Sequence, residues 1–195
     1  MVLLVAVAVG LAAGLLRAWI EKRTYRVYEL KWPILVLVAF IPQYFAFYNA
    51  NTRTQISGNL ASILLVSSMI ILLAFSLLNI HKVSFWPITL GFLLNFLVIL
   101  FNDGFMPISP ETVGRLLPGQ DSSWMVGQQL GYGKDIILTP EMTRLEFLAD
   151  RFISPAIGTY RVAFSLGDVF IAIGVAWLLW SLGGKTRESK QENIQ

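Results

Sequence analysis

Five long apolar blocks constrain this chain more than any other feature of its sequence. They occupy about residues 2–20, 32–49, 60–78, 85–101 and 165–182. A helix needs around 20 apolar residues, at about 1.5 Å each, to cross the roughly 30 Å hydrocarbon core of a bilayer. Each block therefore predicts one transmembrane helix. The second contains Pro42, which we expect to kink its far end.

The composition agrees with a chain whose main solvent is lipid. It is 55% hydrophobic and only 14% charged, whereas soluble domains average about 25% charged residues. The first block is followed, not preceded, by basic residues, so we expect a retained span rather than a cleaved signal peptide. The predicted fold class is an all-α integral membrane protein, with one transmembrane domain at residues 1–184 and a polar cytoplasmic tail at 185–195.

The distribution of Lys and Arg predicts the orientation, because these residues concentrate in cytoplasmic connections. Arg17, Lys22, Arg23, Arg26 and Lys31 surround the first connection. The third connection and the tail add four more basic residues, whereas the second connection has one. We therefore predict an N-out, C-in, multi-pass membrane protein.

This orientation places residues 102–163 outside the membrane as a small ordered cap between the fourth and fifth helices. The segment holds five of the eight prolines and seven of the twelve acidic residues. Ser109-Pro110-Glu111 and Thr139-Pro140-Glu141 each predict a helix start, with a side-chain cap, a proline in the first turn and an acidic residue at the positive end of the helix dipole. Residues 135–138 predict a short strand between these two helices.

Two sets of residues within the spans predict helix packing. Ala6, Gly10 and Gly14 repeat every four residues, and small residues on one helix face let two backbones approach closely. We expect packing within the chain, with self-association as the alternative. Asn95 is a polar side chain at mid-bilayer depth, so we expect it to hydrogen-bond to another helix.

Ser165 and Asp168 stand where the last span begins. A hydroxyl residue followed three positions later by a carboxylate is typical of a capping box, in which each side chain accepts from an orphan backbone N–H. The alternative is a functional carboxylate at Asp168, since charges near the bilayer are expensive unless partnered. Arg151 and Arg161 are the partners that the sequence suggests.

Asn102-Asp103-Gly104 has the chemistry of a turn that ends the fourth span. Met106 and Pro107 then predict an extended segment along the membrane surface. An alternative brings Asn102, Asp103, Asp150 and Asp168 around one outer pocket, where carboxylates share a proton or hold a cation.

Three stretches together resemble a bacterial membrane-protein family catalogued only as a domain of unknown function. They are Asn102-Asp-Gly-Phe-Met-Pro-Ile-Ser109, Thr143-Arg-Leu-Glu-Phe-Leu-Ala-Asp150 and Phe164-Ser-Leu-Gly-Asp168-Val-Phe-Ile-Ala-Ile-Gly174. The family pattern has Asn-Gly-Gly-x-Met-Pro-Val-Ser, then Thr-Arg-Leu with Leu-Gly-Asp, then Ser-Ile-Gly-Asp-Val. Asp103 and Ala149 stand where that pattern has glycine. The resemblance implies a multi-pass protein of a bacterial cytoplasmic membrane, without an assigned activity. It draws attention to Asn102, Met106, Pro107, Arg144, Asp150 and Asp168.

The sequence contains no phosphate-binding loop, zinc-protease motif or nucleophile elbow. It also has no cysteine and only one histidine. We therefore predict no catalytic residue, no metal and no cofactor, with the lipid bilayer and other membrane protein subunits as partners and no nucleic acid. The leading hypothesis is a non-enzymatic accessory or scaffold subunit of a membrane complex. The alternatives are a small-molecule or ion transporter that uses Asp168 near its outer mouth, and an envelope enzyme whose outer-face carboxylates converge in an open cleft.

Overall fold

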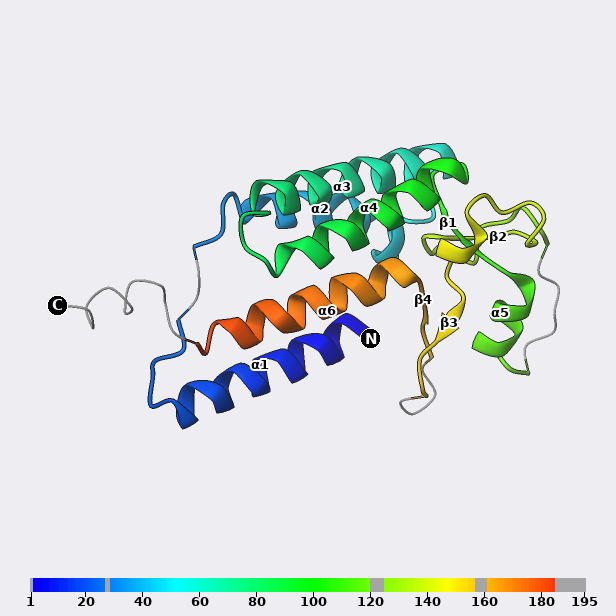
Figure 1. The fold of residues 1–195 in the computed structure, drawn as a ribbon. Coiled ribbons are helices and arrows are strands. Elements are labelled where there is room, and N and C mark those ends of the chain that lie inside the picture. The colour runs from blue at the N-terminus through cyan, green and yellow to red at the C-terminus, as the bar shows by residue number, and fades with distance from the viewer. Residues whose placement is uncertain (1, 27–28, 120–124, 157–160, 185–195) are drawn as a thin grey trace.

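Five apolar helices lie side by side in the computed structural model, which describes residues 2–26, 29–119, 125–156 and 161–184 (Figure 1). The helices are α1 (Val2–Ile20), α2 (Ile34–Gln43), α3 (Gly58–Leu78), α4 (Phe85–Phe101) and α6 (Leu166–Ser181). α6 packs against both α1 and α4, α4 packs against α3, and α3 packs against α2. Two helices, α1 and α3, are long and apolar enough to cross a membrane. The other three apolar helices, Ile34–Tyr48, Phe85–Phe101 and Leu166–Ser181, are shorter.

Successive helices alternate in direction, so the connections gather at two ends of the bundle (Figure 1). At the cap end, the guanidinium of Arg53 lies 5.1 Å from the ring centre of Tyr132. At the opposite end, the Lys31 backbone N–H donates to the Asn79 side chain at 2.8 Å, and Arg26 N–H donates to the Leu182 carbonyl at 3.3 Å. The basic first connection, the third connection and the end of α6 therefore share one end of the bundle.

The second apolar block changes helix type where its proline occurs. Pro42 lies inside α2, and the chain continues as a π-helical turn, η1 (Tyr44–Tyr48). Asn49 N–H donates to the Tyr44 carbonyl at 2.9 Å, five residues back. Because proline has no N–H, the regular ladder is interrupted here and a wider turn takes its place.

The small residues of α1 pack within the chain. Ala6, Gly10 and Gly14 are all buried. A Cβ atom at Gly10 would lie 2.7 Å from the Ala176 backbone of α6, and one at Gly14 would collide with the Leu179 carbonyl. Gly10 and Gly14 therefore lie where α1 and α6 of the same chain approach closely.

The chain is mostly helical, as predicted, but the cap contains short strands as well as helices, so the fold is not purely α. β1 (Met106–Ile108) pairs in parallel with β2 (Asp135–Ile137), and β3 (Phe152–Ile153) pairs antiparallel with β4 (Ala163–Phe164). The predicted strand at 135–138 is confirmed. The predicted helix after Ser109 is also present, as α5 (Pro110–Leu116), with the Ser109 hydroxyl accepting from Thr112 N–H at 3.1 Å.

The second predicted cap helix is wrong. Residues 140–142 form a turn, and only a short 3₁₀ helix, η2 (Glu146–Leu148), follows. The reason is that Arg144 is held by contacts from outside its own segment, described below, and Leu145 takes a left-handed conformation with φ of 56°. A left-handed residue cannot continue a right-handed helix.

The cap is joined to the bundle by a shared apolar core. Phe105, Met106 and Leu148 of the cap are buried with Phe47 of η1 and Leu65 of α3. A separate cluster inside the cap joins Ile108, Val113, Ile137 and Ala163. The cap is therefore packed against one end of the helices and carries its own small core.

Candidate functional site

Backbone pairing with strand β1 brings two charged residues, Lys134 and Asp150, to the junction between the cap and the bundle. Met106 N–H donates to the Lys134 carbonyl at 2.9 Å, and Asp150 N–H donates to the Pro107 carbonyl at 3.0 Å. β1 thus lies between β2 on one side and the segment around Asp150 on the other. Residues far apart in the sequence are brought together by backbone pairing.

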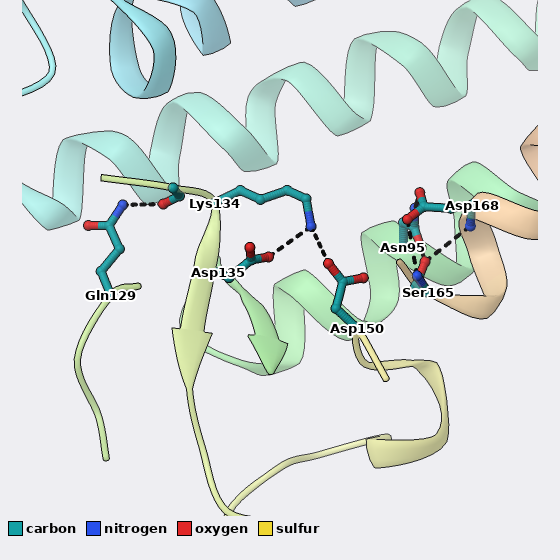
Figure 2. A network of polar contacts seen from close by, with 8 residues as sticks. Asn95, Gln129, Lys134, Asp135, Asp150, Ser165 and Asp168 are labelled. Carbon is teal, nitrogen blue, oxygen red and sulfur yellow. Dashed lines mark hydrogen bonds and ion pairs between the residues drawn. The ribbon is translucent and has the colours of Figure 1, made fainter. Parts of the chain in front are cut away.

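Lys134 is the centre of the resulting charge cluster (Figure 2). Its Nζ donates to Asp135 Oδ1 at 2.8 Å and to Asp150 Oδ2 at 2.6 Å. The Asp150 side chain is only 1% exposed, and its Oδ1 is buried without a hydrogen-bond partner among the described residues. One oxygen of this carboxyl is therefore charge-paired, and the other has no partner in the described part of the chain.

The surroundings shift the pKa of both partners upward. Burial raises the pKa of Asp150 to about 7, against the opposing effect of the Lys134 ammonium. Burial alone would lower the pKa of Lys134, but the carboxylates of Asp135, Asp150 and Asp168 outweigh it and raise that pKa above its ordinary value. Lys134 therefore stays charged, while the Asp150 carboxyl can change its protonation state near neutral pH.

A second polar group links α4 to the start of α6. Asn95 Nδ2 donates to Asp168 Oδ1 at 2.9 Å, and the Ser165 hydroxyl donates to Asn95 Oδ1 at 2.8 Å (Figure 2). Ser165 and Asp168 also form the predicted capping box: Asp168 N–H donates to Ser165 Oγ at 3.1 Å, and Ser165 N–H donates to Asp168 Oδ2 at 3.1 Å. Both the capping box and the predicted inter-helix role of Asn95 are confirmed.

Glycines allow this approach of α4 and α6. A Cβ atom at Gly91 would collide with the Gly167 carbonyl, and one at Gly167 would collide with the Asn95 side-chain oxygen. The amide of Asn95 can therefore reach the first turn of α6 only because neither helix carries a side chain at these positions.

Asn102 fixes the loop that follows α4. Its Nδ2 donates to the Val98 carbonyl at 2.7 Å and to the Arg144 carbonyl at 2.8 Å. Arg144 N–H donates back to Asn102 Oδ1 at 3.0 Å. The neighbouring Asp103 is exposed in a left-handed turn with φ of 55°, as its turn chemistry predicts.

A cavity of about 460 Å³ lies between the helices next to these polar groups. Its walls come from α1, α2, η1, α3, α4, α6 and the cap, and most of the side chains lining it are apolar, such as Phe40, Met69 and Phe92. Asn95, Lys134 and Asp168 also line it. The cavity therefore combines an apolar body with polar groups drawn from both clusters.

The structure brings together only part of the predicted outer pocket. Asp168 lines the cavity, whereas Asp150 is buried behind Lys134 and Asp103 lies apart on the surface.

The predicted arginine partners of Asp168 are wrong, because Arg161 donates to the Arg115 carbonyl and Arg151 pairs with Glu146. Asp150 and Asp168 are engaged in an ion pair and a helix cap, so they do not converge in an open cleft as the enzyme hypothesis requires. No group of three His, Asp or Glu side chains in the described parts of the chain is arranged to hold a metal ion.

Lys134 is the site residue that the sequence did not reveal. It precedes the predicted strand at 135–138 directly, which is a local signal for a residue at a sheet edge. Its partners, however, depend on the pairing of β1 with segments 29 and 44 residues away, counted from Met106 to Asp135 and to Asp150. Such a long-range pairing leaves no local pattern in the sequence.

Comparison with known proteins gives a family but no activity. No curated protein and no solved structure matches the chain. A family model described as a family of unknown function, DUF5317, matches residues 27–180. This match covers four of the helices of the bundle and the whole cap, and it shows that the chain belongs to the DUF5317 family.

Proposed function

We propose that this protein is a multi-pass protein of a bacterial cytoplasmic membrane that binds a small amphiphilic molecule inside its helix bundle. The cavity carries the proposal: its 460 Å³ falls within the roughly 300–1,000 Å³ typical of ligand pockets. Such pockets are mainly apolar with a few well-placed polar groups. Asn95, Lys134 and Asp168 are those groups here.

The outer surface of the bundle supports the membrane part of the proposal. Large apolar side chains point outward on all five helices, including Leu4, Leu37, Ile63, Leu93 and Ile173. The basic residues of the first and third connections lie at the end opposite the cap, which favours five spans with the N-terminus and cap outside and the C-terminus inside.

Single cysteines test this topology, because the natural chain has none. Asp103→Cys and Met125→Cys should react with a membrane-impermeant maleimide in intact cells. Lys22→Cys and Val83→Cys should react only after the membrane is permeabilised. All four side chains are exposed, so labelling of the last two in intact cells would contradict the proposed orientation.

Filling the cavity tests ligand binding. Leu72→Trp adds a bulky ring to the cavity wall, and Ile70→Trp adds the same ring to the exposed face of the same helix. Lipid-like molecules that co-purify with the protein in nanodiscs would be identified by mass spectrometry. We expect Leu72→Trp to lose them and Ile70→Trp to keep them; equal retention by both variants would refute a ligand in the cavity.

Asp168 favours transport as the second candidate function, because this carboxylate lines the cavity near the cap end of α6. A transporter would move its ligand across proteoliposomes, and Asp168→Asn would slow that flux. Flux that survives Asp168→Asn unchanged would remove this role. The accessory or scaffold role stays a prediction, and it is compatible with ligand binding because holding a lipid-like molecule requires no chemistry from the protein.

A further inference from the structure

Lys134 lies at the polar end of the cavity, which also contains Asn95 and Asp168, and not all of its hydrogen-bond donors have partners in the described part of the chain. A lysine ammonium has three N–H donors, and Lys134 gives one to Asp135 and one to Asp150. The structure assigns no acceptor to the third among the described residues. Since Lys134 lines the cavity, a ligand there can accept this remaining hydrogen bond.

Asp168 offers the complementary capacity. Each carboxylate oxygen can accept about two hydrogen bonds, and each oxygen of Asp168 receives one, from Asn95 Nδ2 and from Ser165 N–H. No Lys or Arg in the described part of the chain forms an ion pair with it. A ligand in the cavity can therefore donate to Asp168 while it accepts from Lys134.

Charge limits which head group can do both. Asp135 and Asp150 pair with the one ammonium of Lys134, and Asp168 lines the same cavity without an ion pair to a described residue. The polar end of the cavity therefore has an excess of negative charge, which opposes an anionic head such as a carboxylate or a phosphate. A cationic head would be attracted to Asp168 but would lie beside the Lys134 ammonium and could accept no hydrogen bond from it. A neutral hydroxyl both donates and accepts, and it brings no charge into an apolar cavity.

On this basis we propose that the ligand of the cavity is a neutral amphiphile with a hydroxyl head group, held between Lys134 and Asp168 with its apolar chain between the helices. This assignment rests on the proposed function and adds the chemical class of the ligand. Long-chain alcohols, monoacylglycerols and diacylglycerols belong to this class.

A set of probes that differ only in the head group tests the proposal. The wild-type protein in phosphatidylcholine nanodiscs would be photolabelled with a 12-carbon alcohol bearing a mid-chain diazirine, and the labelled peptides mapped by mass spectrometry. 1-Dodecanol, dodecylamine and dodecanoate would compete at pH 7, with their concentrations corrected for partition into the lipid. We expect labelling of cavity-lining peptides, and 1-dodecanol to compete at least about tenfold more strongly than either charged analogue.

The outcomes separate this proposal from the function on which it rests. Cavity labelling that dodecylamine or dodecanoate blocks as well as 1-dodecanol would overturn the hydroxyl assignment and leave ligand binding intact. Absence of cavity labelling by the probe, together with equal lipid retention by Leu72→Trp and Ile70→Trp, would overturn both. Because the probe series is read on the wild-type protein, no result depends on a variant that fails to fold.

Two variants locate the contacts. Lys134→Met keeps most of the apolar stem but removes the donor, and Asp168→Asn keeps an oxygen that can accept the backbone bond of the capping box. Each should reduce the preference for 1-dodecanol about tenfold, whereas Lys22→Met, at the opposite end of the bundle, should leave it unchanged. A preference that survives in both Lys134→Met and Asp168→Asn would overturn the placement of the head group.

Discussion

The helix bundle and the cap are held together by different kinds of contact. In the bundle, small residues let helices approach until their backbones touch, as at Gly10 and Gly14 against α6 and at Gly91 against Gly167. In the cap, polar side chains tie together segments that are far apart in the sequence, as Asn102 does with Arg144 and Lys134 with Asp150. The bundle is therefore sensitive to added volume, and the cap is sensitive to lost hydrogen bonds.

Adding one methyl group at the α4–α6 contact should have the largest effect. Gly167→Ala places a Cβ atom against the Asn95 side chain and the Gly91 backbone, neither of which can move freely. Overpacking of this kind costs about 3 kcal/mol and occasionally more. We expect a marked loss of the free energy of unfolding, measured by denaturant titration in detergent with circular dichroism.

Gly58→Ala is the matched control for this change. Nothing lies within 4 Å of a Cβ atom at Gly58, which begins α3. The same methyl group should be neutral there or stabilise the protein by up to about 1 kcal/mol, because alanine restricts the unfolded chain. Equal destabilisation by both substitutions would show that contact between α4 and α6 is not what Gly167 provides.

Removing the side-chain amide of Asn102 should have the second largest effect. Asn102→Ala deletes three hydrogen bonds and leaves the Arg144 backbone N–H and carbonyl without their partners. The bond to the Val98 carbonyl is buried and the two bonds to Arg144 are part-buried. A fully buried group left unsatisfied costs about 1–3 kcal/mol, so we expect a loss of roughly 2–3 kcal/mol in the same titration.

Arg144→Ala separates the backbone of this residue from its side chain. Arg144 is exposed, and its contacts with Asn102 use only the backbone. The substitution should change the stability by no more than about 0.5 kcal/mol. A cost comparable to that of Asn102→Ala would mean that the arginine side chain, not the clamp on its backbone, stabilises the loop.

The same contrast explains what could be predicted from the sequence. The helices of the bundle were predicted to within about two residues, apart from the π-helical end of the second block, because long apolar runs depend on local composition alone. The caps at Ser109 and Ser165 were also predicted, since each involves residues three positions apart. The predictions that failed concern the cap. The helix expected after Thr139 does not form, because Asn102 holds the backbone of Arg144. Lys134 was missed, because it reaches the site through the pairing of β1 with a distant segment.

The raised pKa of the Asp150 carboxyl makes the stability of the cap depend on pH. Its pKa is about 7 in the folded protein and ordinary, about 3.9, in the unfolded chain. The folded state therefore binds the proton more tightly, so this group adds stability as the pH falls from about 7 toward 5 and adds no further change above about 8. The slope is at most about 1.4 kcal/mol per pH unit, or about 3–5 °C in melting temperature for a chain of this size.

Two variants test whether Asp150 causes this dependence of stability on pH. Lys134, Asp135 and Asp168 are the charged groups that act on Asp150, and Asp150→Asn removes its titration, so the rise in melting temperature between pH 7 and 5 should disappear. His81→Gln should retain the rise, because the exposed His81 has no part in the cluster. A rise that is lost in His81→Gln and kept in Asp150→Asn would contradict the assignment.

We expect the smallest loss of stability from removing a serine that caps a helix, either in the bundle or in the cap. Ser57 Oγ accepts from Leu60 N–H at 3.4 Å at the start of α3, and Ser109 Oγ accepts from Thr112 N–H at 3.1 Å at the start of α5. Replacing either serine by alanine should lower the free energy of unfolding by about 1 kcal/mol. Ser109→Ala should cost more, because its hydrogen bond is shorter and less exposed.

Hydrogen exchange in the Ser109→Ala variant then tells whether the bundle and the cap unfold together. If the shared core of Phe105, Met106 and Leu148 makes them one cooperative unit, Ser109→Ala should speed exchange in both α5 and η1. Faster exchange confined to α5 would show that the cap opens by itself while the bundle stays folded.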